Sequence, residues 1–152
     1  PIDAVTDIAG LDTDMAISIR SQLNGSDLAV EISVVSENAL DNAKLVVYLV
    51  EDGILSDQIN YFDGDENSPY YQQGNPIVDF VNEDVLRASL SGIFGDNIAS
   101  TGALQEYKAT YSTSLNSDYV PANMHIIAMV VQDDNTALNA QTASLDSFKD
   151  YE

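Results

Sequence analysis

The chain has 152 residues, 45% of them hydrophobic and 20% charged, with 25 acidic residues against 5 basic ones and a formal net charge of −20. This composition fits one globular domain rather than a disordered chain, and its negative field repels phosphate backbones, which argues against nucleic-acid binding. The absence of cysteine excludes disulfides and thiolate chemistry, and no apolar run approaches the ~20 residues needed to span a membrane.

The first predicted elements in the chain are two strands joined by a tight turn. Hydrophobic and polar or small residues alternate over 15–20 and again over 28–34, a period of two that is typical of antiparallel strands with one buried face. Between them, Asn24 and Gly25 are expected to supply the positive φ angles of a hairpin turn. Residues 1–12 precede this pattern. Because the chain begins with a proline rather than a methionine, we expect them to be a leader or linker of a processed chain.

The middle of the chain allows alternatives. Residues 43–55 carry hydrophobic side chains on both faces, which predicts a central strand covered on both sides, or covered by the loop that follows. Residues 52–82 are polar and rich in glycine and proline, and we interpret them as one long loop with a short strand at best. The next segment, 82–92, fits either a helix capped by Asn82 or an alternating strand.

The last third of the chain predicts the clearest strands. They cover residues 106–115, 123–132 and 137–145. With the earlier segments they predict an all-β, two-sheet antiparallel sandwich of seven or eight strands. Its Greek-key connections are expected to be of the immunoglobulin or fibronectin-III type, with one long loop. We expect the sandwich over 13–147 and a tail at 148–152, with Phe94 in the turn at 92–98 plugging one end.

Four short motifs in these segments resemble a known family. They are Glu51-Asp52-Gly53 at the end of a hydrophobic strand, Leu86-Arg87 followed by Gly92 and Gly95, Asn123 before the strand at 124–131, and Asn139-Ala140. They make residues 28–145 similar to the C-terminal β domain of the Omp28-related outer membrane proteins of Bacteroidetes. The resemblance implies an extracellular or cell-envelope location and a neighbouring domain in a longer parent chain. It also favours a strand at 82–92. The thioredoxin-like domain that often precedes this β domain carries a CxxC motif, but this chain has no cysteine, so no redox activity is implied.

Few residues could carry catalysis. His125 is the only histidine, no Gly-x-Ser-x-Gly turn surrounds any serine, and we interpret His125 as a structural or surface residue of its strand. For Arg87, an ion pair with nearby acids is favoured over a clamp for a ligand carboxylate. Without a nucleophile–base pair, a cysteine or a phosphate-binding loop, the sequence predicts a protein that is not an enzyme. Its many carboxylates leave a hydrolase as a less favoured alternative.

The stretch FDGDENSPYY at 62–71 is the sharpest chemical feature. Asp63, Asp65 and Asn67 have the first three spacings of an EF-hand loop, but the pattern fails at Ser68, where such a loop needs glycine. We predict an exposed turn with its acids in water, keep Ca²⁺ at these three residues as the alternative, and expect no other cofactor. The turn is expected to be held by aromatic residues that fold back against the sheet, namely Tyr61, Phe62, Tyr70 and Tyr71.

The sequence therefore predicts a non-catalytic accessory or interaction domain of a secreted or outer-membrane protein, an adhesive role included. Its expected partner is a protein or a glycan at the cell surface. A calcium-binding or carbohydrate-binding β-sandwich module is the alternative. The carbohydrate alternative is kept because the eight tyrosines could replace the absent tryptophans in stacking on sugars.

Overall fold

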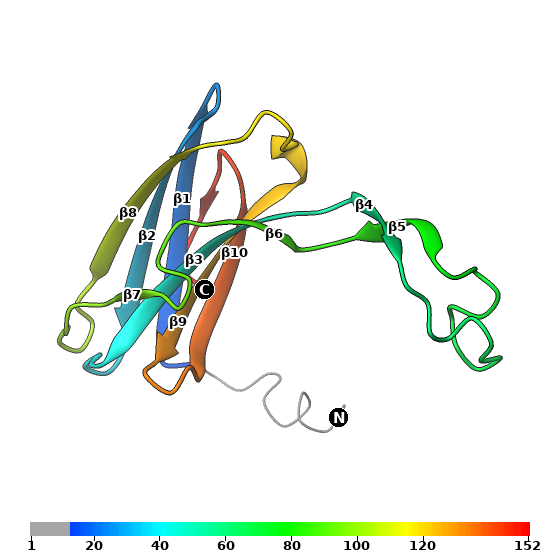
Figure 1. Ribbon diagram of the computed structural model, residues 1–152. Coiled ribbons are helices and arrows are strands. Elements are labelled where there is room, and N and C mark those ends of the chain that lie inside the picture. Colours follow the sequence, from blue (N-terminus) through cyan, green and yellow to red (C-terminus); the bar gives the residue numbers. More distant parts are fainter. Residues whose placement is uncertain (1–12) are drawn as a thin grey trace.

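The computed structural model describes residues 13–152, which fold almost entirely into β-strands (Figure 1). The strands are β1 (Met15–Asn24), β2 (Asp27–Ser36), β3 (Ala43–Glu51), β4 (Ile54–Gln58), β5 (Ile77–Asn82), β6 (Val85–Ser89), β7 (Asp96–Asn97), β8 (Tyr107–Ser114), β9 (Met124–Gln132), β10 (Ala137–Ser144) and β11 (Phe148–Lys149). Within the described residues the one helical element is the 3-10 turn Pro121–Asn123, so the helix considered at 82–92 is absent and β6 lies there.

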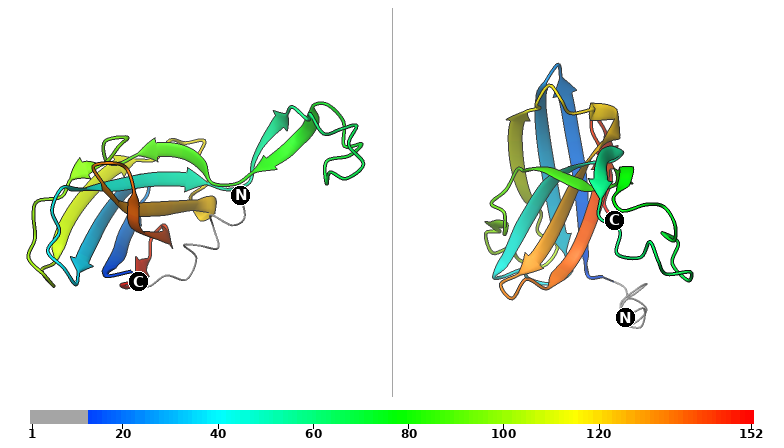
Figure 2. Two further views of the ribbon diagram at one scale, coloured as in Figure 1. Left: turned by 90° about the horizontal axis from the view of Figure 1, so that it is seen from below. Right: turned by 45° about the vertical axis from the view of Figure 1, so that its right-hand side comes forward.

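Two antiparallel sheets pack face to face, which confirms the predicted sandwich (Figures 1 and 2). One sheet has the order β11-β1-β2-β8, and the other has the order β10-β9-β3-β6 with β7 also on β3. Seven of the sandwich strands have five or more residues. The core between the sheets contains fully buried side chains from both, among them Ile17, Ile19, Ile32, Leu45, Val47, Leu49, Ile126 and Val130. Each such side chain contributes about 1.5–3 kcal/mol by leaving water.

The hairpin between β1 and β2 forms as predicted, with a different pair of turn residues. Asn24 is paired with Asp27 in the ladder, so the two-residue loop is Gly25-Ser26. Gly25 has a φ of +64°, whereas Asn24 is not in the positive-φ region. A glycine at the first loop position suits the twist of a tight hairpin, because it adopts a positive φ without steric cost.

Strand β3 is covered on both faces, as its sequence indicates. On its outer face Val46 is buried, and the cover comes from residues 91–95 rather than from the loop after β3. The Tyr48 hydroxyl donates a hydrogen bond to the Ile93 carbonyl in this cover. Gly95 has a φ of +89°, and a Cβ at this position would lie 3.0 Å from Val46 Cγ2 and 2.9 Å from Lys44 Cβ. The expectation that Phe94 plugs one end of the sandwich is wrong, because 74% of this side chain is exposed.

The segment expected as one long loop contains a β-hairpin that leaves the sandwich. Strands β4 and β5 pair antiparallel in a sheet of their own, with Ile54 opposite Asn82 and Leu55 opposite Val81. Figure 2 shows the hairpin projecting away from the two packed sheets, with the connection between its strands at the far end. We call residues 54–82 the arm.

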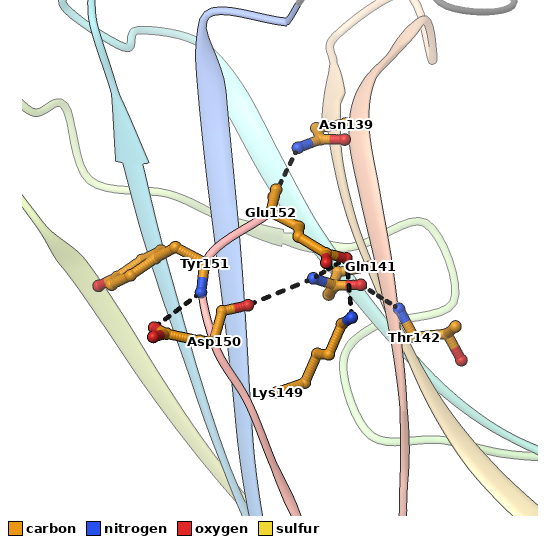
Figure 3. Close-up of polar contacts among 7 residues, drawn as sticks. All are labelled: Asn139, Gln141, Thr142, Lys149, Asp150, Tyr151 and Glu152. Atoms are coloured by element: carbon orange, nitrogen blue, oxygen red, sulfur yellow. Dashed lines mark hydrogen bonds and ion pairs between the residues drawn. The ribbon is translucent and has the colours of Figure 1, made fainter.

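The C-terminal residues 148–152, expected as a tail, lie along the edge of β1. The Ile17 amide donates to the Glu152 carbonyl at 3.0 Å, beyond the short β11 ladder. Side chains of β10 hold the same segment from the other sheet, since Asn139 Nδ2 lies 3.2 Å from the Glu152 carbonyl (Figure 3). Gln141 Nε2 approaches the Asp150 carbonyl at 3.4 Å. This segment therefore joins the two sheets along one seam.

Candidate functional site

The arm exposes most of its large apolar side chains. Tyr61 is 87% exposed and Val78 67%. Other large apolar arm residues that are half or more exposed are Leu55, Ile59, Phe62 and Val81. An isolated two-stranded hairpin is marginally stable in water, and many exposed large apolar side chains on one element are typical of interaction sites. The arm is therefore the strongest candidate for a functional surface in the described chain.

A pocket of about 250 Å³ lies where the arm strands meet their connecting loop. Its apolar lining comes from Ile59, Tyr61, Phe62, Tyr70, Ile77 and Phe80. The rings of Tyr70 and Phe80 meet edge to face with centroids 6.2 Å apart. The prediction that the aromatic residues of 61–71 fold back against the sandwich sheet is thus wrong. Three of them surround a pocket on the arm itself, because the loop has its own small apolar centre.

Asn60 holds this loop together from its interior. The side chain is buried, and its Nδ2 donates to the carbonyls of Tyr70 at 2.9 Å and Gly74 at 3.0 Å. Its Oδ1 accepts from the Phe62 amide at 3.0 Å, and its own backbone amide donates to Asn75 Oδ1 at 3.1 Å. A buried amide with its hydrogen-bonding groups satisfied fixes the backbone around it. The connection between β4 and β5 is therefore an ordered, self-packed loop.

The acidic stretch at the tip also participates in the loop's hydrogen bonds. Asp63 Oδ1 accepts from the Gly74 amide at 2.8 Å, and Asp65 Oδ1 accepts from the Asn67 amide at 3.0 Å. Asp65, Glu66 and Asn67 are exposed, whereas Asp63 is partly covered. No group of three acidic or histidine side chains within residues 13–152 is placed to hold a metal ion. Calcium at Asp63, Asp65 and Asn67 stays a prediction.

A buried ion pair lies at the base of the arm, between β3 and β6. Glu51 is only 1% exposed, and its Oε2 lies 3.2 Å from Nε of Arg87, in an ion pair rather than a well-directed hydrogen bond. Its Oε1 accepts from the Val120 amide at 2.8 Å. The Arg87 guanidinium also lies 4.3 Å from the ring centroid of Tyr119 and 3.5 Å from a carboxylate oxygen of Asp118. The predicted structural role of Arg87 is confirmed.

A second polar contact at the base involves the single histidine. His125 Nε2 lies 2.9 Å from Oδ2 of Asp52, and Oδ1 of the same carboxylate accepts from the Asp84 amide at 2.8 Å. The hydrogen bond from the Asp84 amide, together with His125, lowers the pKa of Asp52 from its usual value, although desolvation opposes the shift. Within residues 13–152 this is the one side-chain hydrogen bond of His125, so no serine or threonine hydroxyl is paired with it. The Asp52 carboxylate therefore links the end of β3, where the chain enters the arm, both to β9 and to the turn by which the chain leaves the arm.

Sequence reasoning missed three of these features: the arm, its Asn60 centre and the partner of Arg87. The sequence did contain a signal for the arm. Apolar residues at 54–55 and at 77–81 lie on either side of the acidic stretch at similar separations, as the two strands of a hairpin would. The bulge between Ser56 and Gln58 breaks the alternation of the first run, which conceals its strand character.

Comparison with known proteins agrees with this architecture. A family model described as outer membrane protein Omp28 matches residues 3–149. The fold is similar to that of HBP35 of Porphyromonas gingivalis, with a TM-score of 0.63, 13% identity, and coverage of 95% of this chain and 45% of that one. It is also similar to a domain of the outer membrane lipoprotein Omp28 from Porphyromonas gingivalis, with a TM-score of 0.53, 18% identity, and coverage of 90% and 91%.

At these identities the structural likeness shows the fold alone. The chain spans less than half of the HBP35 structure that it matches. A search among curated proteins gave no match. Within residues 13–152, no helix has the length and apolar character needed to cross a bilayer.

Proposed function

The chain belongs to the Omp28 family of outer membrane proteins and is associated with the cell envelope; from this premise we propose that it is a non-catalytic interaction domain whose arm docks on a partner protein. The observation that carries the proposal is the exposed apolar surface of residues 54–82 on an ordered loop. A protein partner is favoured over a glycan because aliphatic side chains such as Leu55 and Val78 contribute to the surface beside the aromatic ones.

The base of the arm supports this role. The Glu51–Arg87 pair and the Asp52–His125 contact lie where β3 leads out and β6 leads back in. Fixing both strands at the exit lowers the entropy that the arm loses when it binds, which favours affinity. The sandwich acts as the support, and the arm presents the contact surface.

The apolar surface contributes to binding but does not give tight binding by itself. Burying one large apolar side chain is worth about 1.5–3 kcal/mol, so the half-exposed set on the arm offers roughly 5–10 kcal/mol. Association costs about 4–15 kcal/mol in lost freedom of motion. Specific recognition therefore needs additional polar or charged complementarity.

Site-specific photo-crosslinking in cells that produce the protein tests the proposal. A photoreactive residue at Tyr61 is expected to form a discrete adduct with one partner. The same residue at Phe94, an aromatic position on the sandwich that is also largely exposed, should not form this adduct. Replacing 54–82 by a short glycine-serine turn should abolish co-purification of that partner. The arm can be removed because its two ends are adjacent, with the Gly53 amide 3.0 Å from Glu83 Oε2.

Unchanged partner association in the arm-deleted protein would overturn the proposal, provided that the sandwich still unfolds cooperatively. Turnover of a glycan or peptide substrate that is lost on a single carboxylate-to-amide change would favour the hydrolase alternative instead. Arm-dependent retention on a glycan array would favour the carbohydrate-binding module.

A further inference from the structure

We propose that the arm pocket receives one apolar side chain from a positively charged polypeptide segment, whose lysine or arginine residues face the carboxylates of the arm. This inference rests on the function proposed above and specifies the chemistry of the partner. The juxtaposition that carries it is an apolar pocket on an element that bears only negative charge.

The arm has no internal counter-charge. Residues 54–82 contain five acidic side chains and no lysine, arginine or histidine. Two of the acids, Asp57 and Asp79, lie on the paired strands near the pocket, and the Asp79 amide donates to Asp57 Oδ1 at 3.3 Å. The Asp57 carboxylate thus lies beside the backbone of Asp79, so both strands carry negative charge in this part of the arm, and a cationic partner would complement that charge.

A second copy of this chain does not supply such a partner. All five basic side chains belong to the sandwich and have neighbours of opposite or complementary character. Lys44, Arg87, Lys108 and Lys149 each lie 3.5 Å or less from a carboxylate oxygen, and the Arg20 guanidinium lies 4.2 Å from the ring centroid of Phe148. Each copy also carries a net charge of −20, so two copies repel one another. The partner is therefore a different protein.

The pocket has the size of an anchor site for a side chain. Its volume of about 250 Å³ is below the roughly 300–1,000 Å³ of pockets that enclose drug-sized ligands. Tyr61 and Phe62 at its rim present aromatic faces, which attract lysine and arginine as well as apolar groups. One buried apolar residue flanked by basic residues fits both the lining and the surrounding charge.

The absence of tryptophan from the chain provides a direct assay. The probe is a short peptide with one tryptophan between lysine pairs, compared with a peptide in which glutamate replaces lysine. We expect the lysine peptide to bind the full chain with a blue shift of its tryptophan emission, and the glutamate peptide not to bind. Raising the salt concentration from about 0.1 M to about 1 M shortens the Debye length from about 10 Å to about 3 Å and should weaken binding strongly.

Matched variants assign the effect to the arm. Asp57→Asn with Asp79→Asn should weaken binding of the lysine peptide roughly 2- to 30-fold, since each of the two exposed charge contacts is worth about 0.2–1 kcal/mol. Asparagine tolerates the φ of +53° at position 79, so the arm should keep its fold. Glu37→Gln with Asp41→Asn removes the same charge from exposed sites on the sandwich and should leave binding unchanged.

The outcomes separate this inference from the proposed function. Equal binding of the lysine and glutamate peptides, or equal losses of binding in the two variant pairs, would overturn the inference that the partner is cationic. The proposed function would remain supported if crosslinking to a partner still depended on the arm. Unaltered binding of the lysine peptide to the arm-deleted protein would reveal attraction by the acidic surface as a whole and overturn the inference. Arm-dependent dimerisation in sedimentation would overturn it in favour of a second copy. Failure of crosslinking at Tyr61 would instead contradict the proposed function.

Discussion

Replacing Arg87 with methionine tests the ion pair at the base of the arm. The change retains an apolar stem beside Tyr119 and removes the guanidinium that faces the buried Glu51 carboxylate. The Val120 amide remains as a hydrogen-bond donor to that carboxylate, but no positive charge replaces the one that is lost. We expect a clear loss of stability, because breaking a buried pair from one side leaves an uncompensated charge.

Two limits set the size of the loss. At 3.2 Å the two charges attract by about 5 kcal/mol at an effective dielectric constant of about 20. The other limit is the typical cost of removing one partner of a buried pair, about 3–5 kcal/mol, which arises because the remaining charge stays desolvated. Partial solvation of the site favours the lower end of this range, so we expect a loss of about 3 kcal/mol. For a domain of this size the melting temperature should fall by roughly 6–12 °C.

Urea unfolding at pH 7, followed by circular dichroism, measures the loss of unfolding free energy, and thermal melts measure the corresponding fall in melting temperature.

A double-mutant cycle gives the control. Glu51→Gln removes the charge but retains the acceptor oxygen for the Val120 amide. In that background Arg87→Met should cost less than 1 kcal/mol. An equal loss with glutamate and with glutamine at position 51 would refute the ion-pair reasoning.

Three further predictions concern the arm and the cover of β3. Calcium and magnesium at equal ionic strength should shift the melting temperature equally, with and without the double change Asp63→Asn and Asp65→Asn; a calcium-specific rise that the double change removes would establish a metal site. Asn60→Ala should increase amide hydrogen exchange throughout the connection between β4 and β5 and leave exchange in the sandwich unchanged, since the buried amide closes that loop; protection equal to that of the wild type would contradict this role. Gly95→Ala should destabilise the protein by about 2–3 kcal/mol, because it combines a φ of +89° with a Cβ contact of 2.9 Å. Gly64→Ala, at a position with open space around it, should cost less than about 1 kcal/mol in the same thermal melts.

The sandwich could be predicted because the alternation of hydrophobic and polar residues that marks its strands is visible in short stretches of sequence. Along β1 and β2 every second residue is hydrophobic, and the alternation persists for most of each strand. The ion pair of Arg87 could be predicted as a type of contact, since basic residues are scarce among so many acids. Its partner could not be named, because Glu51 is 36 residues away and is brought close to Arg87 only by the pairing of β3 with β6, in which Glu51 lies opposite Val85.

The candidate site was less predictable. The acidic stretch at 62–71 indicated an exposed loop, yet the nearby aromatic residues were expected on the sandwich, where the largest apolar surface lies. In the structure they pack with Ile77 and Phe80, residues of the returning strand. That contact depends on how Asn60 folds the chain around itself, a hydrogen-bond arrangement that a single polar residue in a sequence does not reveal.

By itself, the sequence determined the all-β class, the hairpin at β1 and β2, the positions of the later strands and the strongly acidic surface, because period-two alternation, turn residues and charge are local properties. Only the tertiary structure decided that residues 54–82 leave the sandwich as an arm, that residues 91–95 cover β3, and that residues 148–152 close the seam between the sheets. These outcomes depend on which distant segments pair and which apolar faces find a cover. That choice is a competition among non-local contacts, and it is resolved only when the whole chain is packed.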